Sequence, residues 1–346
     1  MAGPPGIDSV MILAAGNAIR LRPLTSDRAK AVVPFLNRPL LDHNLDWLRR
    51  CGFEEVVINL HHCADSLRGH YGDCAFGMRI RYSPEETLLG TAGGPRAAME
   101  ALGQTTLLVN GDIAASLSLG PLIEHHHENR ALATMALYSG PEARDYPAIP
   151  VGGDGRVQGF SGGEGEDGEH ACFTGIHLIE RDILDLVPPG RPCGIVDTIY
   201  QHLLSEGLPL HALSLPGCWN EIGTVSRYIE AQIDALRRED YPLAFRGYQR
   251  VTAGGFKNLL AWYGRAGLET PYMLAEGVRV ADGASLVGVV AGPRSRIAEG
   301  ASLESSIVLA GATVGTGASL RGVVVCENAH IPPGTVLRDE VWTAAE

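Results

Sequence analysis

The sequence contains no apolar run of the length that a transmembrane helix needs, so we expect no membrane-spanning segment. Residues 1–8 lack the basic cluster of a secretory signal. The seven cysteines are scattered and form no C-x-x-C pair, which is typical of reduced thiols in a cytoplasmic protein. A net charge of −12 disfavours nucleic acid and anionic membranes as partners. A local basic loop on such a chain can still bind an anionic nucleotide.

The length of 346 residues predicts two domains, and 45% hydrophobic residues are ordinary for a globular protein. In the first part of the chain, apolar runs typical of strands alternate with amphipathic runs typical of helices. The expected strands are 10–15, 55–60, 78–82, 106–109 and 173–179, and the expected helices are 39–51, 65–71, 93–102, 181–186, 197–205 and 225–239. This alternation predicts an α/β fold with a mostly parallel sheet. Ligands in such sheets bind at the carboxyl ends of the strands.

From about Val278 the pattern changes to aliphatic residues spaced six apart, separated by Gly, Ala and Ser. The aliphatic residues are Ile297, Leu303, Leu309, Val314, Leu320, Val325, Ile331 and Leu337, with two steps of five residues among them. A hexapeptide period is typical of a left-handed parallel β-helix. We therefore predict a Rossmann-like domain at 1–240, in which helix 225–239 closes the fold and 152–168 is an exposed loop. A connector without a clear pattern (241–270) and a β-helix domain (271–346) follow.

The first strand runs into a loop that carries Gly16, Arg20, Arg22 and Lys30. Backbone N–H groups with cationic side chains nearby suit the phosphates of a nucleotide. The segment Leu13-Ala14-Ala15-Gly16, followed by Arg20-Leu21-x-Pro23-Leu24-Thr25 and Lys30, resembles the signature of the sugar-1-phosphate nucleotidyltransferases. The chain is similar to bacterial mannose-1-phosphate guanylyltransferases with a C-terminal β-helix, and the resemblance covers residues 9–235 and 275–340.

The resemblance implies transfer of a nucleotidyl group from a nucleoside triphosphate to a sugar 1-phosphate, with GTP and mannose 1-phosphate favoured. Arg20 and Lys30 match the catalytic Arg and Lys, which would neutralise the triphosphate. Further residues match the nucleotide-binding positions, and they are Leu13, Ala14, Ala15, Gly16, Glu85, Gly90, Thr91, Asn110 and Gly111. Thr91 is also expected to cap the helix that follows it.

Two carboxylates match the metal-binding positions of the family. Asp112 follows a predicted strand in Asn110-Gly111-Asp112, and Glu221 stands in Trp219-Asn220-Glu221-Ile222-Gly223-Thr224. Together they imply Mg²⁺ as the cofactor. Thr174 and Gly175 match the sugar-binding strand.

The sequence departs from the family pattern at several positions. Ala18 replaces a glycine, Ile19 a threonine, Ala29 a proline and Glu221 an aspartate. No lysine lies between Lys30 and Lys257, so the family's sugar-phosphate lysine is absent or replaced by an arginine such as Arg156. A Cβ at position 18 would raise the cost of binding if the loop needs a positive φ there.

Two histidine-rich segments resemble metal sites only superficially. His125, His126 and His127 point about 100° apart if they lie on a helix, so they would not converge on one ion. His61-His62-Cys63 is likewise not a convergent set of zinc ligands.

The favoured function is therefore an active nucleotidyltransferase. The alternative is a weakened paralogue that binds a nucleotide sugar or pairs with an active subunit and regulates it. A hexapeptide acyltransferase has little support, because His330 is the only histidine of the expected β-helix. The exposed face of that β-helix offers a surface for a homo-oligomer.

Overall fold

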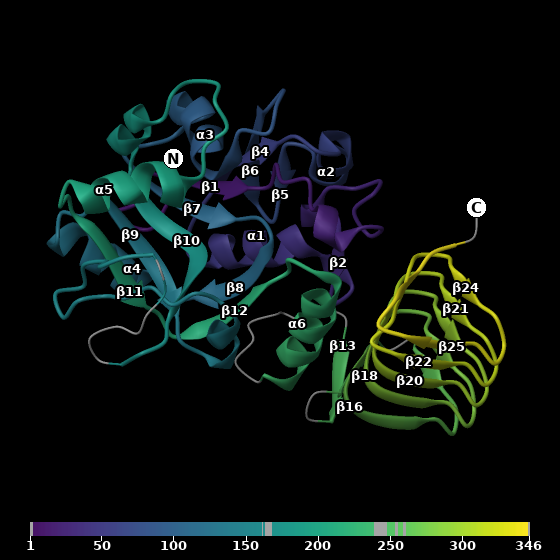
Figure 1. Ribbon diagram of the computed structural model, residues 1–346. Coiled ribbons are helices and arrows are strands. Elements are labelled where there is room, and N and C mark those ends of the chain that lie inside the picture. The colour runs from purple at the N-terminus through teal and green to yellow at the C-terminus, as the bar shows by residue number, and fades with distance from the viewer. Residues whose placement is uncertain are drawn as a thin grey trace. The chain divides into compact units, whose positions relative to one another are not determined.

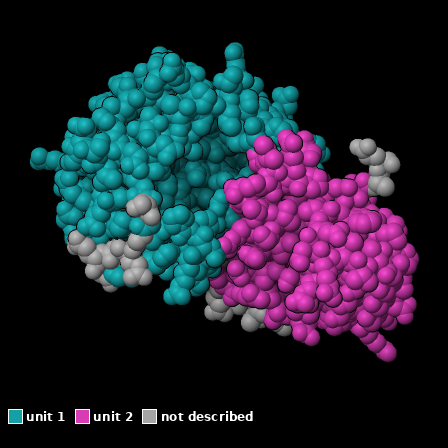
Figure 2. All heavy atoms as spheres, in the orientation of Figure 1, with its two compact units in different colours: residues 1–17, 27–32, 40–221 teal, residues 18–26, 33–39, 222–346 magenta. Residues whose placement is uncertain are grey.

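The computed structural model describes residues 3–160, 162, 168–238, 248–252, 255–258 and 261–344. The chain divides into two compact units, coloured separately in Figure 2. Unit 1 comprises Met1–Asn17, Asp27–Val32 and Leu40–Glu221, and unit 2 comprises Ala18–Ser26, Val33–Pro39 and Ile222–Glu346. All seven cysteines are free thiols. No helix among the described residues is long and apolar enough to cross a bilayer.

An eight-stranded sheet forms the centre of unit 1. Its strands, in spatial order, are β11 (Leu210–Ser214), β9 (Ala133–Tyr138), β10 (Cys172–Glu180), β7 (Thr105–Asn110), β1 (Ser9–Leu13), β4 (Glu55–Leu60), β6 (Met78–Pro84) and β5 (Cys74–Ala75). The pairs β11–β9, β7–β1, β1–β4 and β4–β6 are parallel, whereas β10 runs antiparallel to both of its neighbours. The prediction of a mostly parallel sheet is confirmed.

Strand β1 lies between β7 and β4 in this sheet (Figure 1). Four of its five residues are buried, which the continuous apolar run predicts for a strand covered on both faces. In its register with β7, Leu13 stands opposite Asn110. The loops that follow the two strands therefore leave the sheet side by side.

Helices connect the strands of unit 1. They are α1 (Leu40–Arg50), α2 (Ala64–Tyr71), α3 (Gly90–Ala97), α4 (Leu119–Glu128) and α5 (Gln201–Ser205), with short 3-10 helices at Lys30–Val32, Met99–Ala101, Pro141–Asp145 and Arg181–Leu186 and a π turn at Val196–Tyr200. The segment 197–205 was expected as one helix but divides between the π turn and α5. Helix α3 begins at Gly90, three residues before the expected start.

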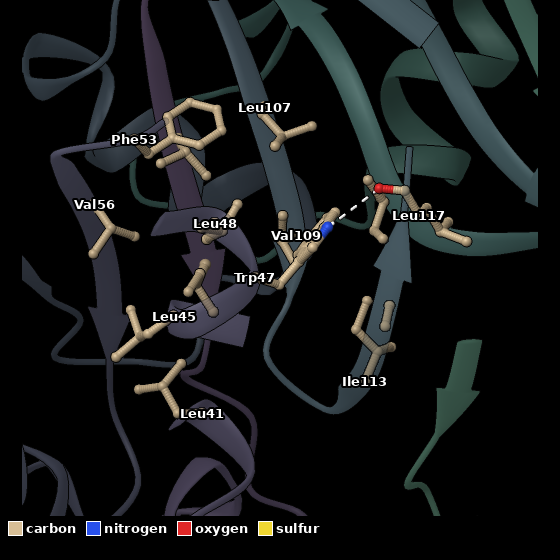
Figure 3. Packing of buried hydrophobic residues seen from close by; sticks show 14 of the residues in the cluster. Leu41, Leu45, Trp47, Leu48, Phe53, Val56, Leu107, Val109, Ile113 and Leu117 are labelled. Atoms are coloured by element: carbon tan, nitrogen blue, oxygen red, sulfur yellow. Dashed lines mark hydrogen bonds between the residues drawn. The ribbon is translucent and has the colours of Figure 1, made fainter. Parts of the chain in front are cut away.

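Helix α1 presents Leu41, Leu45 and Leu48 to the core beneath β1 and β4 (Figure 3). The i, i+4 and i+7 spacing of these leucines places them on one face of the helix. The indole of Trp47 lies in the same cluster and donates its Nε1–H to the carbonyl of Leu117 at 3.2 Å. This bond ties α1 to β8 (Ile113–Leu117), which pairs antiparallel with β12 (Gly217–Glu221).

Unit 2 contains a parallel β-helix. Its strands are β13 (Tyr248–Thr252), β14 (Gly255–Asn258), β15 (Trp262–Tyr263), β16 (Gly267–Leu274), β17 (Arg279–Val280), β18 (Ser285–Ala291), β19 (Arg296–Ile297), β20 (Ser302–Val308), β21 (Thr313–Val314), β22 (Ser319–Arg321), β23 (Val324–Val325), β24 (His330–Ile331), β25 (Val336–Arg338) and β26 (Val341–Trp342). One face is the ladder β15-β17-β19-β21-β24, and all its pairs are parallel. The predicted β-helix is confirmed.

Each coil of the β-helix is 17 residues long, as the bond between Thr313 and His330 on neighbouring rungs illustrates. Aliphatic side chains stack inside it, with Val280, Ile297, Val314 and Ile331 in one column. The coil is one residue shorter than three hexapeptides, so one side regularly spans five residues. The five-residue step from Leu320 to Val325 is therefore part of a regular repeat, and the preceding coil has its own between Leu303 and Val308.

The inward residue of one column differs from the expected one. We expected Leu309, six residues after Leu303, but Val308 stands in register with Val325. The six-residue spacing predicted Leu309 wrongly, because the side of the coil between Leu303 and Val308 spans only five residues.

Two segments join unit 2 in ways that the sequence pattern did not reveal. Helix α6 (Val225–Arg237), expected to close the first domain, packs against β16, β18 and β20. Strands β13 to β16 lie largely within 241–270, where no clear pattern was visible. Strands β14, β15 and β16 continue the parallel ladders of the β-helix without the hexapeptide spacing, whereas β13 pairs antiparallel with β14. Strands β2 (Pro34–Phe35) and β3 (Arg38–Pro39) form a short hairpin in this unit.

Candidate active site

A pocket of about 260 Å³ opens at the carboxyl ends of β1 and β7 in unit 1. Ten of the predicted site residues line it, and they are Leu13, Ala14, Ala15, Gly16, Lys30, Gly90, Thr91, Asn110, Gly111 and Asp112. Ala31, Asn59 and Leu88 complete the lining. The parallel pairing of β1 with β7 explains the convergence, because both strands deliver their following loops to one edge of the sheet.

Lys30 and Asp112 form an ion pair in this pocket. The Nζ of Lys30 lies 2.8 Å from Oδ2 of Asp112, and the two side chains are 12% and 32% exposed. A pair that is this far withdrawn from water is screened less than one on the open surface. The positive charge and the carboxylate are therefore held at the same place in the pocket, 82 residues apart in sequence.

Neighbouring groups fix each partner of this ion pair. Lys30 begins a 3-10 helix whose preceding residue, Ala29, donates its N–H to Oγ of Ser66 at 2.9 Å. On the other side, the N–H of Gly111 donates to the carbonyl of Leu13 at 2.9 Å. A Cβ on Gly111 would lie 2.8 Å from that carbonyl oxygen, so the turn before Asp112 requires glycine to approach β1 so closely.

Glu221 is brought to the same turn by strand pairing. It ends β12 and stands opposite Ile113, the residue after Asp112. Trp219 anchors this strand, because its indole is buried and donates to the carbonyl of Thr174 at 2.8 Å. Of the two predicted metal carboxylates, Asp112 thus precedes β8 and Glu221 ends the paired strand β12, and their oxygen donors are of the kind that Mg²⁺ prefers. The described residues contain no group of three or more His, Cys, Asp or Glu side chains placed to hold a metal.

Asn59 is a pocket residue that the sequence analysis missed. It is 2% exposed, its Oδ1 accepts the N–H of Ala14 at 2.6 Å, and its Nδ2 donates to Oε1 of Glu85 at 2.7 Å. The signal was an amide side chain inside the buried and otherwise apolar run 56–60 of β4. Buried polar groups in such strands generally have partners, and here one partner is the backbone of the loop after β1.

Glu85, predicted to bind the nucleotide, is buried and has both carboxylate oxygens engaged. Oε1 accepts from Asn59, and Oε2 accepts the N–H of Leu89 at 2.8 Å. It thereby connects the loop after β1 to the start of α3. In this geometry Glu85 positions the backbone on both sides of the pocket.

Gly90 and Thr91 bring the start of α3 to the pocket wall. Gly90 has φ +77°, and a Cβ there would lie 2.6 Å from the carbonyl oxygen of Cys193, so only glycine fits. Thr91 was expected to cap a helix that follows it. Because α3 starts at Gly90, Thr91 lies in its first turn, and its Oγ1 accepts the N–H of Ile195 at 2.8 Å.

The two predicted sugar-binding residues differ in their surroundings. Gly175 has φ +75° and lies directly against the side chain of Asn110, a pocket residue. Thr174 is 1% exposed, and its hydroxyl donates to the carbonyl of Ala136 at 2.7 Å. Gly175 therefore adjoins the pocket, whereas the hydroxyl of Thr174 faces the core.

Arg20 and Ala18 belong to unit 2. Arg20 lines a hollow there together with Thr224, Ser226 and Arg237, so its role beside the phosphates stays a prediction. Ala18 has φ 46° and ψ 38°, which is the left-handed conformation that the sequence analysis raised as a condition for strain. Ile19 follows it and is 63% exposed.

Other groups considered from the sequence have partners elsewhere. His125 contacts Nδ1 of His211 at 3.2 Å, His126 contacts Thr134 and Glu180, and His127 contacts the carbonyl of Gly6. The three rings therefore diverge, as expected. Arg156, considered as a replacement for the missing lysine, donates to the carbonyl of Gly207 and lies 3.7 Å from Asp154.

The arrangement suits binding of a polyphosphate. One side of the pocket supplies the backbone of the loop after β1, and the other supplies the turn at Asn110–Asp112, with Lys30 as a cation between them. Phosphoryl-type transfer depends mainly on positioning and charge neutralisation. The pocket contains groups for both, and it presents no Ser–His or Cys–His pair for covalent catalysis among its lining residues.

Comparisons with known proteins agree with this geometry. The family model "Nucleotidyl transferase" matches residues 9–238, and the model "GlmU-like, C-terminal hexapeptide" matches residues 258–340. A UTP–glucose-1-phosphate uridylyltransferase of Synechocystis is 28% identical over 299 residues, covering 80% of this chain and 76% of the relative.

Two mannose-1-phosphate guanylyltransferases have similar sequence identity to this chain and similar coverage. The enzyme of Mycobacterium tuberculosis is 28% identical and covers 70% of this chain and 68% of its own length. A probable enzyme of Arabidopsis thaliana is 28% identical and covers 66% of each. The match of the nucleotidyl transferase model across residues 9–238, which include every residue of the pocket, shows that the chain belongs to the nucleotidyl transferase family.

Proposed function

We propose that this protein is a sugar-1-phosphate nucleotidyltransferase that uses the pocket at the ends of β1 and β7. The reaction joins an oxygen of the sugar 1-phosphate to the α-phosphorus of a nucleoside triphosphate, and the bond to pyrophosphate breaks. The observation that carries the proposal is the Lys30–Asp112 pair, held at 2.8 Å between two backbone loops. Relatives that act on mannose 1-phosphate or on glucose 1-phosphate support this substrate class.

The residues would divide the work as follows. Lys30 neutralises phosphate charge as it develops, while the N–H groups of the loop after β1 orient the triphosphate. Asn59 and Glu85 hold that loop in place through the bonds to Ala14 and Leu89. Gly90 and Thr91 would form the wall against the base. GTP with mannose 1-phosphate is the pair we favour.

Asp112 and Glu221 would hold Mg²⁺, since one carboxylate comes from the turn before β8 and the other from the end of the paired strand β12. When bound, the ion would neutralise the triphosphate and orient its oxygens. Before the ion binds, Asp112 has Lys30 as its counter-charge. Binding of ion and substrate would therefore require Lys30 to exchange its carboxylate partner for a phosphate oxygen.

Pyrophosphate release tests this proposal. We would supply GTP with mannose 1-phosphate and UTP with glucose 1-phosphate, and compare the natural chain with Asp112→Asn and Lys30→Gln. Each variant should lose about 100-fold or more in turnover, the usual cost of removing a group that stabilises transition-state charge. Asp73→Asn, an exposed carboxylate outside the pocket, is the matched control and should keep full turnover. Ordinary turnover by a folded Asp112→Asn would contradict the proposed role of this carboxylate.

A weakened, regulatory paralogue is the second candidate. The left-handed backbone at Ala18 favours it, since a family glycine is replaced at a position where a Cβ is costly. The two candidate functions predict different behaviour of the natural chain in the pyrophosphate assay. A chain that binds a nucleotide or nucleotide sugar but releases no pyrophosphate with any substrate pair would support the paralogue.

A further inference from the structure

A column of exposed side chains runs along one face of the β-helix in unit 2. Trp262, Arg279 and Arg296 occupy successive rungs of the ladder β15-β17-β19, and each stands in direct register with the next. Trp262 is 56% exposed. Neighbouring rungs of a sheet are about 4.8 Å apart, so the column places an indole ring beside two stacked guanidinium groups.

A hollow of about 660 Å³ adjoins this column. Trp262, Gly277, Arg279, Arg294 and Arg296 line it. Gly277 has no side chain to fill the hollow, and a Cβ there would lie 3.3 Å from Cγ of Arg294. The stem of Arg294 therefore lies across Gly277 and brings a third guanidinium to the same place.

The three arginines have no acidic partner within the part of the chain that the structure describes. None of their side chains takes part in a hydrogen bond or an ion pair there. This includes any pair with Glu276, the acidic residue directly before Gly277 in the sequence. Like charges directly opposite one another on adjacent strands are destabilising. Such an arrangement costs folding free energy that a bound anion would offset.

Arg294 also occupies an unfavourable backbone position. It has φ 59°, and the residues one coil before, one coil after and two coils after are Gly277, Gly311 and Asn328, all with positive φ. Glycine and asparagine adopt the left-handed conformation readily, whereas a long side chain pays about 1 kcal/mol or more for it. Of the two corners of this row that line the hollow, one is Gly277 and the other carries the arginine.

We propose that this hollow is a second ligand site, which binds a nucleoside polyphosphate. The phosphates would accept charge-assisted hydrogen bonds from Arg279, Arg294 and Arg296, and the base would stack on the ring of Trp262. The site lies entirely on the β-helix and is independent of the proposed catalytic pocket. A small polyphosphate suits it better than a long polyanion, because the net charge of −12 would repel an extended chain of phosphates.

Isothermal titration of the full chain with GTP tests the proposal. We expect two binding events per chain in the natural protein and one in Arg294→Gly. This variant removes one guanidinium and returns the corner to the residue type of its neighbours, so it should also raise the midpoint of thermal unfolding. Loss of binding together with a gain in stability could not come from misfolding.

Ser305→Gly is the matched control. Ser305 has φ 46° at another corner of the β-helix and does not line the hollow. This variant should gain stability in the same way and retain both binding events. Arg279→Gln and Arg296→Gln should each weaken the second event about tenfold or more, the effect of losing one charge-assisted hydrogen bond.

The same titrations separate the two parts of the site. Pyrophosphate, which carries no base, should bind the second site more weakly than GTP, and Trp262→Ala should remove that difference. A single binding event in the natural chain that is unchanged in Arg294→Gly would overturn the proposal, whereas a single event lost in Arg294→Gly would count only against GTP binding in the catalytic pocket. A second event that persists in Arg294→Gly and in Arg296→Gln would also overturn the proposal, because the arginines would then contribute nothing.

Discussion

Replacing Ala18 with glycine should stabilise this protein, contrary to the usual effect of an alanine-to-glycine change. Ala18 has φ 46° and ψ 38°, and its carbonyl accepts bonds from the N–H of Leu21 at 3.0 Å and the hydroxyl of Thr25 at 2.9 Å. These two bonds hold the strained backbone, and glycine would keep both of them. An L-residue in this conformation costs about 1–2 kcal/mol.

The expected gain is smaller than this penalty. Glycine also increases the conformational entropy of the unfolded chain, which costs about 0.4–1 kcal/mol. The net stabilisation of Ala18→Gly should therefore be about 0.5–1 kcal/mol. Urea unfolding followed by circular dichroism would measure it.

Ala64→Gly provides the control for this measurement. Ala64 is the first residue of α2 and lies in an ordinary helical conformation, so glycine there should cost about 0.5–1 kcal/mol. The two variants are chemically identical changes with opposite expected signs. If both destabilise the protein equally, position 18 is not left-handed in solution, and the structural argument for a weakened paralogue fails with it.

Three further predictions concern unit 1. Asn59→Ala should destabilise the protein by about 1–3 kcal/mol, because it leaves the N–H of Ala14 and Oε1 of Glu85 without their hydrogen-bond partner. Unchanged nucleotide affinity in calorimetry would contradict the role of Asn59 in holding the loop. Glu221→Asp should change the Mg²⁺ concentration needed for half-maximal turnover, and the same requirement in both chains would exclude Glu221 from the metal site. Burial lowers the pKa of His177 to about 3, so the unfolded chain binds a proton below about pH 6.5 that the folded chain does not. Stability should therefore fall as the pH falls from 6.5 towards 3, by up to about 1.4 kcal/mol per pH unit for this group, and unfolding of His177→Asn should show a shallower slope.

The sequence predicted the parts of the fold that follow a simple period. The buried run at β1, the leucine spacing of α1 and the hexapeptide repeat each determined an element correctly, because each reflects contact with one core. The partner of α6 could not be predicted in this way. Its apolar face shows that it is buried but carries no information on which core it covers, and it packs against β16, β18 and β20.

The candidate site likewise contains residues that the sequence pattern could place and residues that it could not. Residues that follow strands β1 and β7 could be placed together from the sequence, because parallel strands end at one edge of a sheet. Asn59 and the engagement of both oxygens of Glu85 could not, since these contacts join segments 45 and 26 residues apart through side-chain geometry. The sequence indicated only that a positive φ at Ala18 would be costly, and not that the backbone adopts one, because an alanine gives no local signal for the left-handed conformation.

The 17-residue coil limits how this part of the chain can change in length. Removal or duplication of a whole coil, for example residues 296–312, would leave every remaining aliphatic residue in register with its neighbours above and below. Removal of a single residue from the same segment would turn each later inward side chain outwards along its strand. The β-helix can therefore be lengthened or shortened only in whole coils, and an added coil would extend the face that carries Arg279 and Arg296 by one rung.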